Sequence, residues 1–284
     1  TAPFRPPRPL NSAMKKLNFG CGTRIAAGWE NIDFAPFAPG VKQVNLLAGF
    51  PYPDASFDVA YSSHVLEHFS RADGRFLVGE CHRVLKPGGL VRIVVPDLEN
   101  TCREYLRVLD AVDASETARR QYDWAILELL DQMVRTVPSG EIRDFERRLI
   151  ESGDQELLAY FIARTENVRH DPEPPRPLAQ RLAGLSAGKV KAKLLSLYAR
   201  GVVKLIPSNL RRMLVDQTPP GEKHRWMYDR HGLGLLLTGA GFTGVRFLNA
   251  QESGIPGLLE DRLDVNADGQ PYKNVSLYAE ARKP

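Results

Sequence analysis

The sequence predicts an α/β fold built on a mostly parallel sheet. Between residues 15 and 97, short apolar runs of strand type alternate with turn-like or helix-like stretches, as in strands joined by crossovers. From residue 98 to about 225 the strand pattern disappears, and it returns only near the C-terminus. We therefore expect one sheet domain, formed by 15–97 and 226–284, with a helical insertion over 98–225.

The expected strands are short apolar runs that end at turn residues or at glycine. Five precede the insertion and two follow it: 15–19, 29–34, 41–47, 56–63, 90–97, 244–250 and 274–282. Leu77, Cys81, Val84 and Leu85 recur at helical spacing and predict a helix over 71–85 with one buried face. The run at 90–97 is apolar enough to be buried on both faces.

The composition is that of a soluble globular protein, with 43% apolar and 25% charged residues. The sequence contains no run of 18 apolar residues, so it predicts no membrane span. Residues 1–14 are rich in proline and arginine and lack the apolar run of a signal peptide, so we expect a disordered leader or tag. Cys21, Cys81 and Cys102 form no C-x-x-C pair, which favours reduced thiols and a cytoplasmic location.

The positive charge is concentrated in one part of the expected insertion. From Arg176 to Arg212 there are nine Lys or Arg residues and no Asp or Glu, mixed with apolar residues. Such a segment is typical of a basic amphipathic helix that contacts an anionic membrane surface. The alternative is a lid helix packed on the sheet domain with its lysines in water, which is the commoner case. Nucleic acid is not expected as a partner, because no aromatic residues alternate with the charge.

Two glycines and an acid mark a ligand site near the N-terminus. Gly20 and Gly22 directly follow the first strand, where missing Cβ atoms allow a ligand close to the backbone. Asp33 ends the second strand, where α/β nucleotide sites place an acid that accepts from ribose hydroxyls. A dinucleotide site would place its acid about 20 residues further on. The shorter spacing argues against NAD, although a plain tight turn remains an alternative.

Several stretches resemble the class I S-adenosylmethionine-dependent methyltransferases, and most closely a bacterial group associated with surface-glycan and secondary-metabolite pathways. They are LNFGCG, GWENIDF, FPYPDASFDVAYSSHVLEHF, CHRVLKPGGLVRIVVPDLE and LLLTGAGF. The resemblance is dense over 16–97 and loose over 224–282. It implies a Rossmann-like fold with a seven-stranded sheet, S-adenosylmethionine as cofactor and no metal. The insertion at 98–225 would then be a lid or substrate-recognition region.

The resemblance also implies roles for particular residues. The expected cofactor-binding set is Asn18, Phe19, Gly20, Cys21, Gly22, Asp33, Phe34, Asn45, Leu46, Ser63 and His64. Gly20 to Gly22 would lie under the methionine part, Asp33 at the ribose and Asn45 with Leu46 at the adenine. Asn18 and Asn45 stand where many members carry an acid, but an amide oxygen can still accept a hydrogen bond.

The stretch SSHVLEH at 62–68 has two interpretations. His64, Glu67 and His68 fit the H-x-x-E-H spacing of inverted zinc peptidases, with both histidines on one helix face and Glu67 as general base. Alternatively, His64 lies beside the sulfonium at the tip of the fourth strand. His68 then serves as a general base or only shapes the loop through a backbone hydrogen bond. The surrounding sequence favours the cofactor interpretation.

The stretch EKHRWMYD, just after the expected insertion, holds further candidates. His224 is a third candidate catalytic residue, and Trp226 and Tyr228 are candidate walls of a substrate pocket. Packing where the insertion rejoins the sheet is the alternative.

The predicted function is methyl transfer from S-adenosylmethionine, class EC 2.1.1, by in-line displacement to an acceptor. We expect a hydroxyl, or else an amine, on a small molecule: a sugar, a glycan or a natural-product scaffold. A non-catalytic binding protein on the same fold is the alternative from another class, and the zinc peptidase is a remote one.

Overall fold

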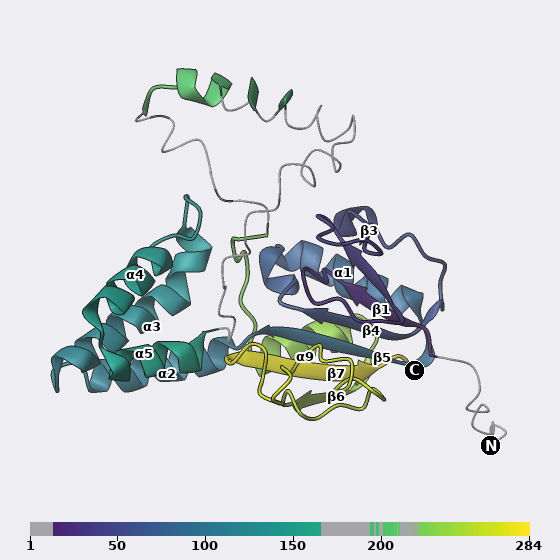
Figure 1. The fold of residues 1–284 in the computed structure, drawn as a ribbon. Helices are drawn as coiled ribbons and strands as arrows, with labels where there is room; N and C mark the ends of the chain where they lie inside the picture. The colour runs from purple at the N-terminus through teal and green to yellow at the C-terminus, as the bar shows by residue number, and fades with distance from the viewer. Residues whose placement is uncertain are drawn as a thin grey trace.

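A seven-stranded sheet lies at the centre of the computed structural model, which describes residues 14–165, 194–195, 197–198, 201–208, 210, 218 and 221–284 (Figure 1). The strand order is β3-β2-β1-β4-β5-β7-β6. The strands are β1 Lys16–Phe19, β2 Trp29–Asp33, β3 Lys42–Gln43, β4 Phe57–Ser63, β5 Leu85–Pro96, β6 Thr243–Leu248 and β7 Ser276–Arg282. Strand β7 is antiparallel to β5 and to β6, whereas the other pairs are parallel. The prediction of a mostly parallel, seven-stranded sheet is confirmed.

Two strand boundaries differ from those expected. The strand expected over 41–47 is limited to β3, because Asn45 caps the 3-10 helix η1 (Leu46–Ala48) and accepts a hydrogen bond from the Leu47 amide at 3.2 Å. Strand β5 begins at Leu85 rather than at 90, so the KPGG stretch does not separate helix from strand. Gly88 instead donates its amide to the carbonyl of Lys283 at 2.8 Å, which ties this stretch to the end of β7.

Two helices cover one face of the sheet. Helix α1 (Arg71–Val84) begins at Ser70, whose hydroxyl accepts from the Asp73 amide at 3.2 Å, and helix α9 spans Arg230–Gly239. Their apolar faces share one core with the strands. It includes Leu77, Cys81, Leu233 and Leu237 from the helices and Leu17, Phe19, Val91 and Ile93 from the sheet. The helix predicted over 71–85 is confirmed, with its apolar stripe buried as expected.

The opposite face is covered by the irregular segment 249–275 rather than by a helix. Leu258, Leu263 and Val265 from this segment join Tyr61 and Tyr278 in a second core. Strand residues alternate between the two faces, so Arg92 points into this second layer while its neighbours point into the first. The Arg92 guanidinium is fully buried and forms ion pairs with Asp264 at 2.7 Å and Glu280 at 2.8 Å.

Four helices follow β5 and form a separate group beyond the end of the sheet (Figure 1). They are α2 (Leu98–Asp110), α3 (Glu116–Val134), α4 (Ile142–Ser152) and α5 (Gln155–Arg164). They enclose a core of their own, formed by Trp124, Phe145, Leu149, Leu157 and Phe161.

Two of the sequence predictions concern segments that lie wholly or mostly outside the described residues. Residues 1–13 and most of the basic segment 176–212 lie outside the described residues, so the leader and membrane-contact predictions stay predictions. Within the described residues, no helix is both long enough and apolar enough to span a bilayer.

Candidate functional site

The carboxyl ends of β1, β2 and β4 meet at one edge of the sheet, where parallel α/β sheets bind ligands. A small cavity of about 160 Å³ lies at this edge, and we call it the loop cavity. Its lining contains Asn18, Gly20, Cys21, Gly22, Thr23, Arg24, Tyr61, Ser63, His64, Tyr272 and Lys273. More than half of the expected cofactor-binding residues are therefore brought together around one space.

Backbone hydrogen bonds hold the glycine loop against β2. The Gly20 amide donates to the Ile32 carbonyl at 2.9 Å, and the Gly22 amide donates to Asp33 Oδ2 at 2.9 Å. Asp33 Oδ1 accepts from the Ala35 amide at 2.8 Å. Gly20 and Gly22 have φ values of +64° and +51°, a left-handed conformation that favours glycine. The spacing of glycines and acid thus produces one hydrogen-bonded cradle.

The Asn18 side chain stabilises the same loop through hydrogen bonds. Its side chain is buried, and Nδ2 donates to the Arg24 carbonyl at 2.8 Å and to Asn31 Oδ1 at 2.9 Å. Arg24 in turn stacks on Tyr272, with 3.5 Å between the guanidinium carbon and the ring centroid. An aspartate at position 18 could not donate these two hydrogen bonds, which gives the departure from the family pattern a structural role.

Five residues of the expected cofactor set do not line the loop cavity. One is Asp33, which accepts a hydrogen bond from the amide of the lining residue Gly22. The Phe19 and Leu46 side chains are buried in the main core, where Phe19 packs on Phe50 with ring centroids 5.2 Å apart. Phe34 and Asn45 are exposed at the same edge of the sheet. Successive side chains of a strand point to opposite faces of the sheet. Asn18 therefore lines the loop cavity, whereas Phe19 points into the main core.

A second cavity of about 430 Å³ adjoins the loop cavity, and we call it the large cavity. His64 and Lys273 line both cavities. The walls of the large cavity come from the turn after β4, the helical group α2–α5, the 221–227 stretch and the residues before β7. Part of the helical region 98–225 therefore lines a cavity beside the glycine loop, and its expected role as a lid or substrate-recognition region stays a prediction.

His64 lies at the junction of the two cavities. Its φ value of +53° places a non-glycine residue in the left-handed region, a conformation that is enriched at functional sites. The backbone amide donates to the Val94 carbonyl at 2.9 Å. On the imidazole, Nδ1 lies 3.2 Å from Glu67 Oε1, and Nε2 lies 2.9 Å from Ser276 Oγ. His64 is thus held from both sides.

Glu67 is fully buried between three histidines. Burial raises the pKa of this carboxyl, but the contact with His64 and the fields of His68 and His224 outweigh it and lower the pKa to about 2. Glu67 is therefore a carboxylate at neutral pH. Its closest polar contact is His64 Nδ1, 3.2 Å from Oε1, and within the described residues Oε2 accepts no hydrogen bond.

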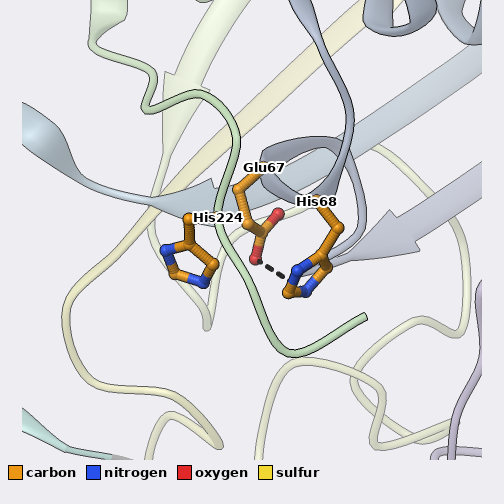
Figure 2. Close-up of side chains that lie close together, drawn as sticks. All are labelled: Glu67, His68 and His224. Atoms are coloured by element: carbon orange, nitrogen blue, oxygen red, sulfur yellow. Dashed lines mark ion pairs between the residues drawn. The ribbon is translucent and has the colours of Figure 1, made fainter. Parts of the chain in front are cut away.

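His68 and His224 gather around Glu67 (Figure 2). His68 Nε2 lies 3.9 Å from Glu67 Oε1, and the ring centroids of the two histidines are 5.2 Å apart. His68 Nδ1 lies 3.0 Å from the Lys223 carbonyl and donates to it in the tautomer that this contact requires. Burial lowers the pKa of His224 to about 4, although Glu67 acts in the opposite direction. All three predicted catalytic histidines therefore meet at one wall of the large cavity.

The arrangement differs from the one the zinc-peptidase interpretation requires. That interpretation places His64 and His68 on one face of a helix. The 3-10 helix η2 contains only Leu66–His68, and His64 precedes it in a left-handed conformation. Glu67 has no exposed surface and is contacted by His64 and His68.

The two predicted substrate-wall residues do not line the large cavity. Trp226 lies at the surface with the Arg71 guanidinium 4.7 Å from its ring centroid, whereas Tyr228 is buried in the core beside Gly74. Met227, between them, lines the cavity. The backbone here is extended and Tyr228 bridges to Asp97, so successive side chains point in opposite directions. Trp226 and Tyr228 therefore do not face this cavity, and their role as substrate walls stays a prediction.

Several lining residues were missed by the sequence reasoning. Lys273 lies in the turn-rich stretch before the last strand and Ser276 is the first residue of β7, and neither belongs to a recognisable motif. Arg135 and Arg164 come from the helical group and are held by acids: Arg135 by Asp131 and Glu222, Arg164 by Glu128 at 2.6 Å. The helical periodicity of this region did not indicate which side would meet the sheet domain.

Comparisons with known proteins agree on one chemistry. Residues 23–93 match the family model described as a methyltransferase domain. A probable S-adenosylmethionine-dependent methyltransferase of Mycolicibacterium smegmatis is 45% identical over 51 residues, which cover 18% of this chain and 19% of that protein. The chain therefore aligns with about a fifth of the length of this curated relative.

Solved methyltransferase structures are also similar, with low TM-scores and lower sequence identities. One is an S-adenosylmethionine-dependent methyltransferase of Thermotoga maritima, with 10% identity and a TM-score of 0.39 over 97% of this chain and 84% of that one. Another is the 1,6-didemethyltoxoflavin-N1-methyltransferase of Burkholderia thailandensis with bound S-adenosylhomocysteine, with 20% identity and a TM-score of 0.26 over 30% and 45%. Scores this low do not establish a common fold. The sequence matches thus show similarity to a methyltransferase domain over residues 23–93 and to an S-adenosylmethionine-dependent methyltransferase over 51 residues.

Proposed function

We propose that the protein is an S-adenosylmethionine-dependent methyltransferase that binds its cofactor at the loop cavity and its acceptor in the large cavity. The observation that carries this proposal is the adjacency of the two cavities, which share His64 and Lys273. A group held in one cavity is within reach of a group held in the other. Proximity of this kind is the main requirement for a direct group transfer between two bound molecules.

The residues of the loop cavity fit the cofactor. Gly22, whose missing Cβ faces open space, leaves the backbone open to the methionine part, in a cavity too small for the whole cofactor. The Asp33 carboxylate accepts from two backbone amides and retains lone pairs for ribose hydroxyls. The exposed ring of Phe34 and the side chain of Asn45 lie further along the same edge, where the adenine would be held.

When bound, S-adenosylmethionine supplies the methyl group, and the residues of this chain position the acceptor and take its proton. His64 is the best-placed proton acceptor, because it faces both cavities and Glu67 contacts its Nδ1 atom. With Nδ1 protonated toward the carboxylate, Nε2 is the basic nitrogen. A base oriented by a buried acid is a recurring arrangement in enzymes that activate hydroxyl groups.

The lining of the large cavity favours a hydroxylated acceptor. Arg135, Arg164, Glu128 and Glu222 offer donors and acceptors in fixed positions, and Trp124 offers an aromatic surface. Sugars and hydroxylated natural products need both kinds of contact. We therefore propose an O-methyltransferase that acts on a sugar, a glycan or a secondary-metabolite scaffold, as the resemblance to the bacterial surface-glycan group also suggests.

Transfer of a tritiated methyl group from S-adenosylmethionine to a panel of saccharides, phenols and amines tests this proposal. We expect label on hydroxylated compounds and a large loss of turnover in the His64→Ala variant. Label on amines alone would contradict the O-methyltransferase assignment. Tight binding of S-adenosylhomocysteine with no labelled product from any class would favour a non-catalytic binding protein.

A further inference from the structure

We propose that Glu67, His68 and His224 form a binding site for one divalent transition-metal ion on the wall of the large cavity. The sequence suggested a metal only through the H-x-x-E-H spacing of His64, Glu67 and His68, and that spacing does not include His224, which lies far along the chain. Metal binding itself does not depend on the proposed function, whereas a role of the ion in methyl transfer does.

The three side chains have the composition and the spacing of a metal site (Figure 2). One donor atom from each of them lies within 4.8 Å of the other two. Donors around a tetrahedral zinc ion with bonds of 2.0–2.1 Å are about 3.3 Å apart. Small side-chain rotations would bring the donor atoms from within 4.8 Å to this spacing. Two imidazoles and one carboxylate are also the protein ligands of several catalytic zinc sites.

The buried carboxylate is an independent sign that a cation belongs here. Glu67 has no exposed surface, its Oε1 atom has His64 Nδ1 at 3.2 Å as its closest donor, and its Oε2 atom accepts no hydrogen bond from the described part of the chain. A buried carboxylate in this state is costly unless a positive charge compensates for it. His64 and His68 contact it at 3.2 and 3.9 Å, which leaves room for an ion between the carboxylate and the rings of His68 and His224.

Backbone hydrogen bonds fix the three ligands relative to one another. The Glu67 carbonyl accepts from the amides of Arg225 and Trp226 at 2.6 and 3.2 Å, so the segment that carries His224 is bound to the turn that carries the other two ligands. The His224 amide donates to the Gln132 carbonyl of α3 at 2.9 Å. The ligands therefore belong to a preformed site and not to three independent surface side chains.

The hydrogen bonds around the three ligands are of the kind that orients metal-binding side chains. Ligating histidines almost always donate their second ring nitrogen to a carbonyl or a carboxylate, which fixes the tautomer. His68 donates Nδ1–H to the Lys223 carbonyl at 3.0 Å and so leaves the lone pair of Nε2 toward Glu67. His64 Nδ1 orients the Glu67 carboxylate at 3.2 Å. Both contacts prepare the donors for a cation.

The donor set indicates the kind of ion. Imidazole nitrogen favours zinc, cobalt, manganese or iron over calcium and magnesium, which prefer all-oxygen sites. Three protein ligands leave at least one position open toward the large cavity. An acceptor hydroxyl bound there would be oriented and made more acidic by the ion, so that His64 could take its proton near neutral pH.

Calorimetric titration of the metal-stripped protein with zinc chloride and with cobalt chloride tests the site. We expect one ion per chain, a visible d–d absorption band with cobalt, and affinity reduced at least about tenfold in His68→Ala and His224→Ala. His231→Ala is the matched control, because His231 is exposed on α9 and lies outside the cluster. Its affinity should equal that of the wild type. Thermal melting checks that each variant is folded.

Two results would overturn the site: no binding at one ion per chain, or unchanged affinity in folded His68→Ala and His224→Ala variants. Titration of the same metal-free protein with S-adenosylhomocysteine separates this inference from the proposed function. Zinc binding without cofactor binding would support the metal site and contradict the methyltransferase. Cofactor binding without zinc binding would do the reverse.

Discussion

The Val65 side chain occupies the space that a Cβ atom on Gly20 would need. A Cβ built on Gly20 would lie 2.4 Å from Val65 Cγ2, and the glycine also has a φ value of +64°. The loop after β1 and the turn after β4 are therefore packed together at the point where the loop cavity forms. The glycine is required by the turn that carries His64 as well as by any ligand.

This contact predicts different consequences for the two glycines of the loop. Gly20→Ala should destabilise the fold by about 2–5 kcal/mol, since overpacking adds about 1–3 kcal/mol to a left-handed strain of about 1–2 kcal/mol. Gly22→Ala meets no atom within 4 Å and should cost only the strain. Denaturant unfolding measures both. Val65→Ala combined with Gly20→Ala should recover part of the loss, and a loss that stays the same would contradict the packing explanation.

The thiol of Cys21 reports on the loop cavity. Burial, followed by the nearby Asp33 carboxylate, raises the pKa of Cys21 from 9.0 to about 11. The thiolate is the reactive species, so the rate of alkylation of the native protein should still increase between pH 9 and 10.5. Mass spectrometry after timed iodoacetamide treatment gives the rate at this residue. A rate that reaches its plateau by pH 9.5 would show an ordinary thiol and a more open loop.

The Arg92 network predicts the largest loss of stability from a single charge. Arg92→Met would leave Asp264 and Glu280 buried without their shared cation, at a cost of about 3–5 kcal/mol. Arg103→Ala removes a guanidinium whose side chain is 75% exposed and should change the unfolding free energy little. Chemical denaturation of both variants makes the comparison. Equal midpoints would mean that the network contributes nothing.

Met227 lines the large cavity, whereas its neighbour Trp226 lies at the surface. Met227→Trp should fill part of the large cavity and lower methyl transfer at least about tenfold, while S-adenosylhomocysteine still binds at the loop cavity. Trp226→Ala, on the outer side of the same stretch, should leave turnover nearly unchanged. Parallel assays of the two variants decide the point. Equal turnover in Met227→Trp and wild type would place the acceptor elsewhere.

The sheet and the placement of the glycine loop beside Asp33 could be predicted from the sequence because both depend on local patterns. Apolar runs, glycines and the spacing from Gly22 to Asp33 are visible in a short window, and the structure joins them by hydrogen bonds between neighbouring strands. The stripe of Leu77 and Cys81 likewise determines which face of α1 is buried. Short-range periodicity was sufficient for these features.

Contacts between distant residues could not be predicted in the same way. Arg92 interrupts a strand that reads as apolar on both faces, and its partners Asp264 and Glu280 lie far along the chain. His224 approaches Glu67 only because the 223–226 stretch is bound to the turn after β4. The directions of Trp226 and Tyr228 depend on the register of that extended stretch, which the sequence does not indicate.

Titration calorimetry with S-adenosylhomocysteine tests the central claim most directly. We expect one binding site per wild-type chain and an affinity about tenfold to a hundredfold lower in Asp33→Ala, because hydrogen bonds to a charged group contribute about 1.5–3 kcal/mol. Asp54→Ala, which removes an acid with a side chain that is 78% exposed, should bind as the wild type does. No binding to the wild type, or equal affinity in Asp33→Ala and wild type, would contradict the assignment of the loop cavity as the cofactor site.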